Sequence, residues 1–404
     1  MSEAHRHQQL AAGQPRNNPA DTTGVGVPSK NPGAGLPGEK PGAGGRLFSL
    51  DVYRGLVMTL LIAEGAGVYS AMRGLSVDWL DPIAAQFFHP AYEGFTFWDL
   101  IQPAFMFIVG VSMVFSMRKR AKQGQSWGVR FRHILIRCVI LFMMGTGLHC
   151  VYAGALVWEL WNVLTQLSVT IMIAFLMMEL PILGQFLISL ALIGVTDLAY
   201  RFIQVEPYDQ VYAAGANFGT YMDTWLMNTV NSDHWVAVNC IPTAAHTIWG
   251  VLAGQVLIGS GGASRKALKL AAWGLAALVV GYGLYWLGYA PMIKRICTVP
   301  YVVAAGGWCV LALALFYWVI DGLGFKRGGW VVAVVGTNSI LIYLVTESLA
   351  HAWLNPKVGV FVVGGLSKVG VSEATATLVN ALVVWALLWG LCYWLYVKRA
   401  FVKI

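Results

Sequence analysis

The chain has 404 residues, of which 57% are hydrophobic and only 11% are charged, whereas a soluble domain is usually about one quarter charged. This composition excludes an ordinary soluble domain and predicts an all-α protein that crosses a membrane several times. The formal net charge of +8 does not indicate nucleic-acid binding, because the basic residues stand in short clusters between apolar segments, where they orient helices in a bilayer.

The first 45 residues differ from the rest of the chain. The stretch "NNPADTTGVGVPSKNPGAGLPGEKPGAGG" is rich in Gly and Pro and has no apolar run, so it cannot bury enough surface to offset the entropy of ordering. It also lacks the apolar core of a secretory signal peptide. We therefore expect a disordered tail over residues 1–45 and one transmembrane domain over residues 46–404.

Apolar stretches follow one another through the remainder of the chain. A spanning helix needs roughly 20 mainly apolar residues. On this criterion we predict ten helices, which are Leu47–Ala66, Trp98–Met117, Ile134–Val151, Leu160–Met178, Ile182–Tyr200, Trp235–Ile258, Ala267–Leu287, Val299–Ile320, Trp330–Ala350 and Ala374–Val397. The apolar stretch Val358–Gly365 is too short to span alone, so we expect it at the interface or in a re-entrant position.

Charge predicts the orientation of these helices. If ten helices alternate, the basic clusters at 118–132, 265–269, 326–327 and 398–403 all fall on one side. The acid-rich loops Ser70–Phe97 and Arg201–His234 fall on the other side, with Lys294 and Arg295 as a minor exception. The positive-inside rule then places both termini in the cytoplasm and the two long loops outside.

The six cysteines show no CxxC spacing, which argues against a zinc site or a redox motif. We expect Cys138, Cys309 and Cys392 to be buried in helices. The remaining three, Cys150, Cys240 and Cys297, fall near outer helix ends, where a disulfide between two of them stays open.

Ionisable groups are costly in a bilayer and usually face a cavity or a partner. Asp51 and Arg54 share a helix face near the cytoplasmic end, where they form an ion pair that fixes the helix or contact a ligand that enters from the cytoplasm. Glu64 lies about 20 Å further along the same helix, at the expected level of the loop that contains His89.

The stretch "FFHPAYEGFTFWDLIQPAFMFIVG" brings several polar residues to the outer end of the second helix. Asp99 and Gln102 share a face, and Asp99 is also suited to cap the helix N-terminus. His89 stands four residues before Glu93, so a helical turn there would let this carboxylate orient the imidazole and raise its basicity. His89, Glu64, Asp99 and Glu93 are therefore the predicted catalytic residues.

Two further polar residues lie within apolar helices. His246 in "IPTAAHTIWG" and Asn338 in "VVGTNSILIY" are expected to form interhelical hydrogen bonds, and the small residues around them also leave room for a slim ligand. His149, Glu159 and Glu347 are weaker candidates at helix ends. No P-loop, HExxH, GxSxG or His/Cys cluster is present, so we predict no metal site.

Five separated motifs resemble one known family. "SLDVYRGLVMTLLIAEG" is similar to an opening "SLDxxRGLxxxxMI", and "HPAYEGFTFWDLIQPAFMFIVGVSM" is similar to "HxxWxGxTxxDLxFPxFxFIxGxS". "NCIPTAAHTIWGVLAGQVL", "KRICTVPYVVAAGGWCVLALALFYWVID" and "VVGTNSILIYL" match three later motifs in the same order. Together they resemble the heparan-α-glucosaminide N-acetyltransferase family and its bacterial relatives.

The resemblance implies an activity. Members of that family transfer acetyl from cytosolic acetyl-CoA to the amino group of a glucosamine on the far side of the membrane, and the family's active-site histidine corresponds to His89. Tyr92, Glu93 and Glu64 depart from the family's pattern, so we expect an acceptor other than heparan sulfate. A bacterial inner-membrane location with the His89 loop in the periplasm is also implied, and a homodimer is suggested by analogy.

The sequence thus leads to two functional hypotheses. In the first, acetyl-CoA enters from the cytoplasm past Asp51, Arg54, Gln102, His246 and Asn338, and His89 acts as general base or acetyl carrier for an amino-sugar or glycan acceptor. In the second, the protein transports an amino sugar or another small solute without covalent chemistry.

Overall fold

The computed structural model describes residues 47–402. Within these residues all regular secondary structure is helical, apart from one isolated bridge between Val205 and Tyr208. The predicted all-α fold is therefore confirmed. The predicted disordered tail, residues 1–45, lies outside the described residues.

Seven helical segments of the described chain are long and apolar enough to cross a membrane. They are Phe97–Lys122 (η1 and α4), Trp127–Ala153 (α5), Ile182–Phe202 (α7), Ala237–Ile258 (η2 and α9), Ala263–Trp286 (α10), Val299–Gly322 (α11 and η3) and Glu373–Val397 (α15). Two bent pairs raise the number to as many as nine: Phe48–Gly65 (α1) with Val68–Gly74 (α2), and Gly329–Gly336 (α12) with Ser339–Lys368 (α13, η4 and α14). The protein is thus a polytopic membrane protein.

The predicted count of ten is not confirmed. The segment predicted over Leu160–Met178 forms α6 (Val163–Met177), which has 15 residues and is short for a span. Its start is set by Asn162, whose side chain accepts a hydrogen bond from the amide of Leu164 and caps the helix. The stretch Val358–Gly365 lies in α14 (Asn355–Lys368), which has no buried residue.

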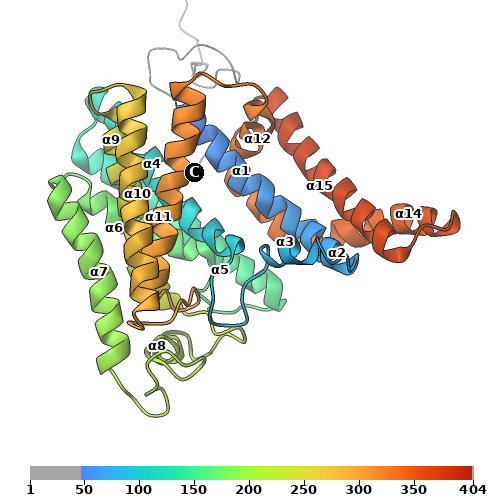
Figure 1. Ribbon diagram of the computed structural model, residues 1–404, viewed down its shortest axis with the longest axis horizontal. Helices are drawn as coiled ribbons and strands as arrows, with labels where there is room; N and C mark the ends of the chain where they lie inside the picture. Colours follow the sequence, from blue (N-terminus) through green and yellow to red (C-terminus); the bar gives the residue numbers. More distant parts are fainter. Residues whose placement is uncertain (1–46, 403–404) are drawn as a thin grey trace, which may run out of the picture. The chain divides into compact units, whose positions relative to one another are not determined.

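Several long helices run across the described domain, with α10 and α11 side by side (Figure 1), and the helices differ in how deeply they are buried. The apolar window of α9 is 78% buried, whereas that of α10 is only 22% buried. Large apolar side chains of α10, such as Leu268, Val279 and Trp286, are exposed, as expected for a helix that faces lipid. α9 packs against α4, and α10 packs against α11.

The contact between α4 and α9 depends on two glycines. A Cβ atom at Gly110 would lie 2.0 Å from the carbonyl oxygen of Thr247, and one at Gly250 would lie 2.1 Å from that of Phe107. The backbones therefore touch directly, which is a common way for helices to pack in membranes.

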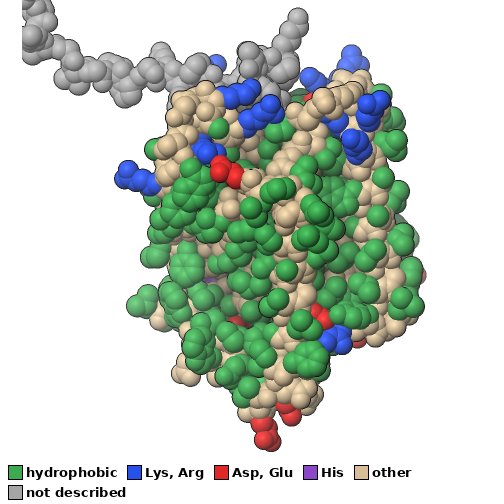
Figure 2. All heavy atoms as spheres, turned by 90° about the vertical axis from the view of Figure 1, so that its left-hand side faces the viewer, with side chains coloured by type: hydrophobic (Ala, Val, Ile, Leu, Met, Phe, Trp, Pro, Cys, Tyr) green, Lys and Arg blue, Asp and Glu red, His purple; other side chains and the backbone are tan. Residues whose placement is uncertain are grey.

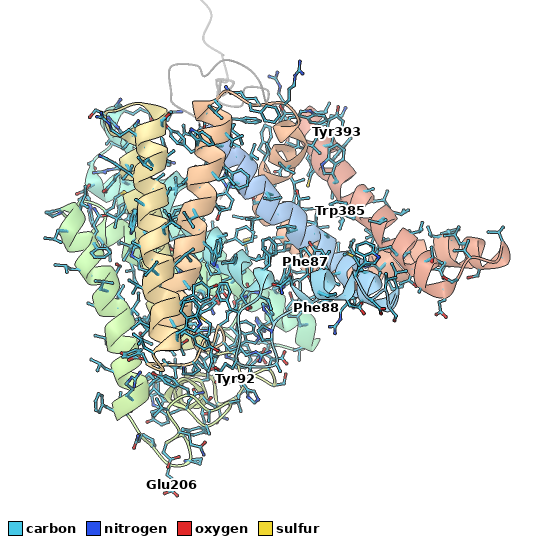
Figure 3. The ribbon with its side chains drawn as sticks, viewed as in Figure 1. Phe87, Phe88, Tyr92, Glu206, Trp385 and Tyr393 are labelled. Atoms are coloured by element: carbon cyan, nitrogen blue, oxygen red, sulfur yellow. The ribbon has the colours of Figure 1, made fainter. Side chains whose placement is uncertain are left out.

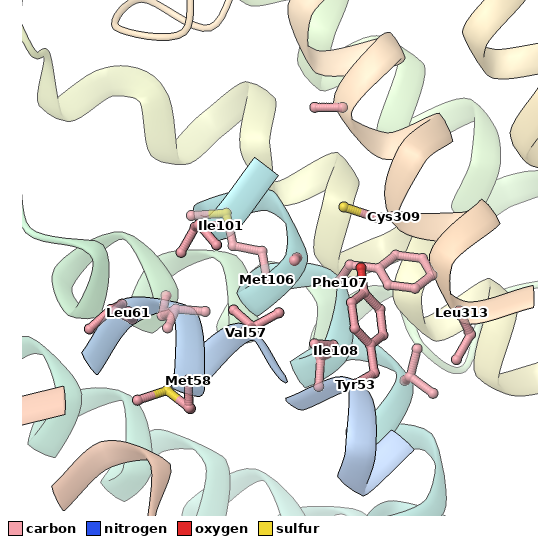
Figure 4. Packing of buried hydrophobic residues seen from close by; sticks show 14 of the residues in the cluster. Tyr53, Val57, Met58, Leu61, Ile101, Met106, Phe107, Ile108, Cys309 and Leu313 are labelled. Carbon is pink, nitrogen blue, oxygen red and sulfur yellow. The ribbon is translucent and has the colours of Figure 1, made fainter. Parts of the chain in front are cut away.

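A continuous apolar core joins α1, α4 and α11. Figure 4 shows Tyr53 of α1 beside Phe107 of α4 and Cys309 of α11, with Met58 and Met106 nearby. Cys138, Cys309 and Cys392 are buried in helices as predicted. All six cysteines are free.

The two long loops that the sequence placed on one side lie at the same end of the described domain. The Nδ2 atom of Asn217 lies 3.4 Å from the hydroxyl of Tyr92, and the ring of His234 lies 6.2 Å from the ring of Tyr92. Figure 3 shows Tyr92 and Glu206 towards one end, with Tyr393 towards the other. In Figure 2 most of the visible Lys and Arg side chains lie at the top of the view, and acidic side chains lie at the bottom. This separation agrees with the predicted division into basic loops on one side and acid-rich loops on the other.

Three short helices complete this end of the domain: α3 (Asp81–Ala85), η1 (Phe97–Leu100) and α8 (Phe218–Met227). Asn217 caps α8 by accepting a hydrogen bond from the amide of Thr220. This cap fixes the start of α8 beside the loop that contains His89.

Candidate functional site

His89 lies in the irregular segment between α3 and η1. Pro90 follows it and disfavours a helical conformation at the preceding residue. The predicted helical turn from His89 to Glu93 does not form, and Glu93 is exposed. The partner of the imidazole is Asp99, so the prediction that Glu93 orients His89 is wrong.

The carboxylate of Asp99 has two separate roles. Its Oδ1 atom lies 2.6 Å from Nδ1 of His89. Its Oδ2 atom accepts a hydrogen bond of 2.9 Å from the amide of Thr96, as part of a capping box at the start of η1. The predicted capping position is confirmed, and the same side chain holds the imidazole.

The side chains of His89 and Asp99 differ in how deeply they are buried. The side chain of Asp99 is 0% exposed, whereas that of His89 is 31% exposed. The carboxylate is therefore shielded from water, while the imidazole remains accessible to a substrate. The backbone carbonyl of Asp99 accepts a hydrogen bond of 2.9 Å from the hydroxyl of Tyr301, which ties this turn to α11.

Lys294 is a member of the site that sequence reasoning did not select. It lies in the loop between α10 and α11, with its side chain 7% exposed and Nζ 3.8 Å from Oδ1 of Asp99. Its ammonium group lies 5.4 Å from the ring centre of Trp235, and the ring of His89 lies 5.3 Å from that same ring. In the sequence, Lys294 and Arg295 stood out only as exceptions to the charge rule.

The environment controls protonation here. Burial lowers the pKa of His89 below its usual value of 6.5, the charge of Lys294 lowers it further, and the hydrogen bond to Asp99 opposes both effects. Burial lowers the pKa of Lys294 to about 8, although Asp99 opposes this shift. At neutral pH the imidazole is therefore neutral. The hydrogen-bond geometry assigns its proton to Nδ1 and leaves Nε2 able to accept one.

Arg295 and two aromatic rings lie beside the His89 site. The guanidinium of Arg295 lies 6.0 Å from the ring centre of Tyr92 and 5.7 Å from that of Trp235, and it donates a hydrogen bond to the carbonyl of Ala91. Burial raises the pKa of Tyr92 to about 12, so its hydroxyl stays protonated.

A cavity of about 280 Å³ lies between α4, α5, α6 and the α12–α13 break. Arg54, His133 and Arg137 line it, together with Ser112 and Thr337. Most of the other lining side chains are apolar, and none of the described lining residues is acidic. The cavity is therefore suited to a slim, largely apolar group with a negative charge near these basic residues.

The two arginines of the cavity differ in their hydrogen bonding. Arg54 donates to the hydroxyl of Ser112. Arg137 has a buried Nε atom with no hydrogen-bond partner among residues 47–402. A buried donor of this kind costs roughly 1–3 kcal/mol, so an anionic ligand would relieve it.

The helical segment formed by η1 and α4 runs from Asp99, the partner of His89, to the cavity. Asp99 precedes Phe105 by six residues, or about 9 Å along a helix. Phe105, Val109 and Ser112 line the cavity. Between the two, Gln102 donates a hydrogen bond to the side chain of Gln166 on α6.

Other predicted residues lie elsewhere. Glu64 is exposed, and within residues 47–402 no hydrogen bond or ion pair joins it to His89 or Asp99. A Cβ atom at Gly65, which follows Glu64, would lie 2.1 Å from the side chain of Thr346. Glu347 follows Thr346 in the chain, so Glu64 lies near the carboxylate of Glu347. Of the predicted catalytic carboxylates, Asp99 holds His89 and Glu64 does not, because α1 turns Glu64 towards η4 (Thr346–Leu354).

His246 and Asn338 have structural partners. His246 is fully buried, and its Nε2 atom lies 2.8 Å from the carbonyl of Val302 on α11, which confirms the predicted interhelical hydrogen bond. Asn338 donates to the carbonyl of Ala400 and accepts from the amide of Val402, so it holds the C-terminal segment. Neither residue lines the cavity, so the structure does not support their predicted contact with a cofactor.

The weaker candidates form pairs of their own. His149 lies 2.8 Å from a carboxylate oxygen of Glu159, and the hydroxyl of Tyr152 donates to Glu347 at 2.6 Å. Asp51 stands one helical turn before Arg54, and their predicted ion pair stays a prediction. Within the described chain, no group of three or more His, Cys, Asp or Glu residues is arranged to hold a metal ion.

A family model described as "Domain of unknown function (DUF5009)" matches residues 46–187. No curated protein matches the chain. The matched segment contains His89, Asp99, Arg54 and Arg137, whereas Lys294 lies outside it. That description names no activity.

Proposed function

We propose that this protein is a transmembrane acetyltransferase, which moves an acetyl group from cytosolic acetyl-CoA to an amino sugar or glycan on the extracytoplasmic side. One observation carries the proposal: an accessible imidazole held by the buried carboxylate of Asp99 lies at the start of the η1–α4 segment, and an arginine-lined cavity lies further along the same segment. The motifs that resemble heparan-α-glucosaminide N-acetyltransferases support the same chemistry. By the same resemblance, we propose a bacterial inner membrane with the His89 loop in the periplasm.

The cavity suits one part of acetyl-CoA. Small-molecule sites usually measure about 300–1,000 Å³, so 280 Å³ holds the pantetheine arm rather than the whole molecule. Arg54 and Arg137 would bind the negative phosphates near the mouth, because guanidinium groups form charge-assisted hydrogen bonds with phosphate. The acetyl thioester would then point along α4 towards Gln102 and His89.

His89 would supply the base. The amine of the acceptor attacks the thioester carbon, and its proton passes to Nε2 of His89, whose Nδ1 proton remains held by Asp99. The carbon–sulfur bond breaks as the carbon–nitrogen bond forms. The imidazolium then returns the proton to the sulfur of CoA, so the products are an amide and free CoA. In an alternative order, His89 accepts the acetyl group first.

Acetyl transfer is tested with purified protein, radiolabelled acetyl-CoA and glucosamine. We expect acetylated product from the wild type and none from His89→Ala. His351→Ala is the matched control, because His351 is exposed on η4 and lies outside both the cavity and the His89 site. Uptake of solute into vesicles without acetyl-CoA, together with an absence of acetylation, would favour the transporter instead. Acetylated His89 in protein treated with acetyl-CoA alone would identify the two-step order.

A further inference from the structure

Lys294 has an unusual position for a lysine. Its side chain is 7% exposed, and the next residue, Arg295, contacts Tyr92 at the end of the domain that carries the two acid-rich loops (Figure 3). Burying an ammonium group is costly unless a partner compensates. The nearest carboxylate is Asp99, at 3.8 Å, which already binds His89.

The loop holds Lys294 at this place through contacts on both sides. The amide of Gly94 donates to the carbonyl of Met292 at 2.8 Å, which links the loop to the segment that follows His89. Asn239 donates to the carbonyl of Arg295 at 2.6 Å, which links it to the start of α9. The ammonium is therefore positioned by backbone contacts immediately before and after it.

Charged and titratable groups from several elements face His89, Asp99 and Lys294, and Tyr301 and Cys297 both face Asp99. His89 faces the charges of Asp99, Lys294 and Arg295. Lys294 faces Asp99, Arg295 and the thiol of Cys297. Asp99 is thus the shared negative charge between the imidazole and the lysine, and it is shielded from water.

We propose that Lys294 is a positioning residue, which fixes the carboxylate of Asp99 and keeps His89 neutral, with Nε2 ready to accept a proton. This role rests on the proposed acetyl transfer, in which His89 is the base. Lys294 itself touches neither donor nor acceptor in this proposal. A purely structural ion pair would stabilise the fold but would leave the titration of His89 unchanged.

The test measures the titration of His89 without relying on catalysis. Diethyl pyrocarbonate reacts with neutral imidazole, so its rate at His89, followed by mass spectrometry of the peptide, reports the neutral fraction at each pH. In Lys294→Met we expect the midpoint to move to higher pH and the rate at pH 6 to fall about threefold or more, because a nearby positive charge is lost. Lys294→Arg keeps the charge and should retain the wild-type midpoint.

Lys368→Met is the matched control, because Lys368 is exposed at the end of α14, and it should leave the midpoint unchanged. For acetyl transfer, we expect Lys294→Met to lower kcat by about tenfold or more while KM for acetyl-CoA is retained. An unchanged His89 midpoint in Lys294→Met would overturn the role of Lys294. Absence of acetyl transfer by the wild type would instead overturn the proposed function. If Lys294→Met does not fold, a shifted midpoint in Lys294→Arg overturns the proposal and an unshifted one supports it.

Discussion

The Nδ1 atom of His89 lies 2.6 Å from Oδ1 of Asp99, and the second oxygen of that carboxylate caps the helix that enters the domain. One side chain thus orients the imidazole and caps the helical segment that also lines the cavity. This relationship links the outer site to the cavity through a single rigid element.

Loss of the Asp99 charge should impair the base. In Asp99→Asn the imidazole loses its anionic partner and Lys294 loses its counterion, so we expect kcat to fall by about 100-fold or more. Acetyl transfer is the measurement. Asp209→Asn, at an exposed loop position, should behave as the wild type. Equal activity of both variants would contradict the assigned role of Asp99.

The pH dependence of acetyl transfer follows from the lowered pKa values of His89 and Lys294. Activity needs neutral His89, so it should fall as the pH decreases through a midpoint below 6.5, because burial lowers the pKa of His89. On the alkaline side it should fall above about pH 8, where Lys294 loses its charge. A profile of kcat/KM between pH 4 and 10 checks both limbs. An acid limb above 6.5 would argue against His89 as the base.

Arg137 should contribute to binding of the donor. Arg137→Gln removes a charge from the cavity while keeping a polar side chain, so we expect KM for acetyl-CoA to rise about tenfold, as for the loss of one charge-assisted hydrogen bond. Arg132→Gln on the same helix is exposed and does not line the cavity, so it serves as the control. If both variants have the wild-type KM, the donor does not use this cavity.

The contact of α4 with α9 should be sensitive to one methyl group. In Gly250→Ala the new Cβ would lie 2.1 Å from the carbonyl oxygen of Phe107, so the helices must separate. We expect a loss of about 1–3 kcal/mol in the free energy of unfolding. Gly283→Ala on α10 has no atom within 4 Å and should change little. The thermal unfolding midpoint in detergent compares the two.

The orientation can be tested with a single cysteine. We expect Glu206→Cys to react with a membrane-impermeant thiol reagent from outside intact cells, because the positive-inside rule places its loop there. Lys122→Cys should react only after lysis. The wild type, with its six free cysteines, gives the background to subtract. The reverse pattern would invert the topology.

Local signals identified much of the site. The polar stretch before the second predicted helix pointed to His89 and Asp99, because polar residues beside an apolar span are rare and costly. The same reasoning selected Glu93 by its spacing of four, but Pro90 prevents the helical turn that this spacing requires. Helix rise selected Glu64, but the direction of its side chain around the helix axis depends on the neighbours that α1 packs against.

The sequence by itself determined the helical class, the membrane location and the separation of basic from acidic loops, because hydropathy and charge act over short stretches of chain. Only the tertiary structure brought Lys294 to Asp99 and lined a cavity with both Arg54 and Arg137. These residues are far apart along the chain, and no local pattern records which side chains face one another. The packing of α4 between α1, α6, α9 and α11 decides those contacts, because it fixes which face of each helix looks inward.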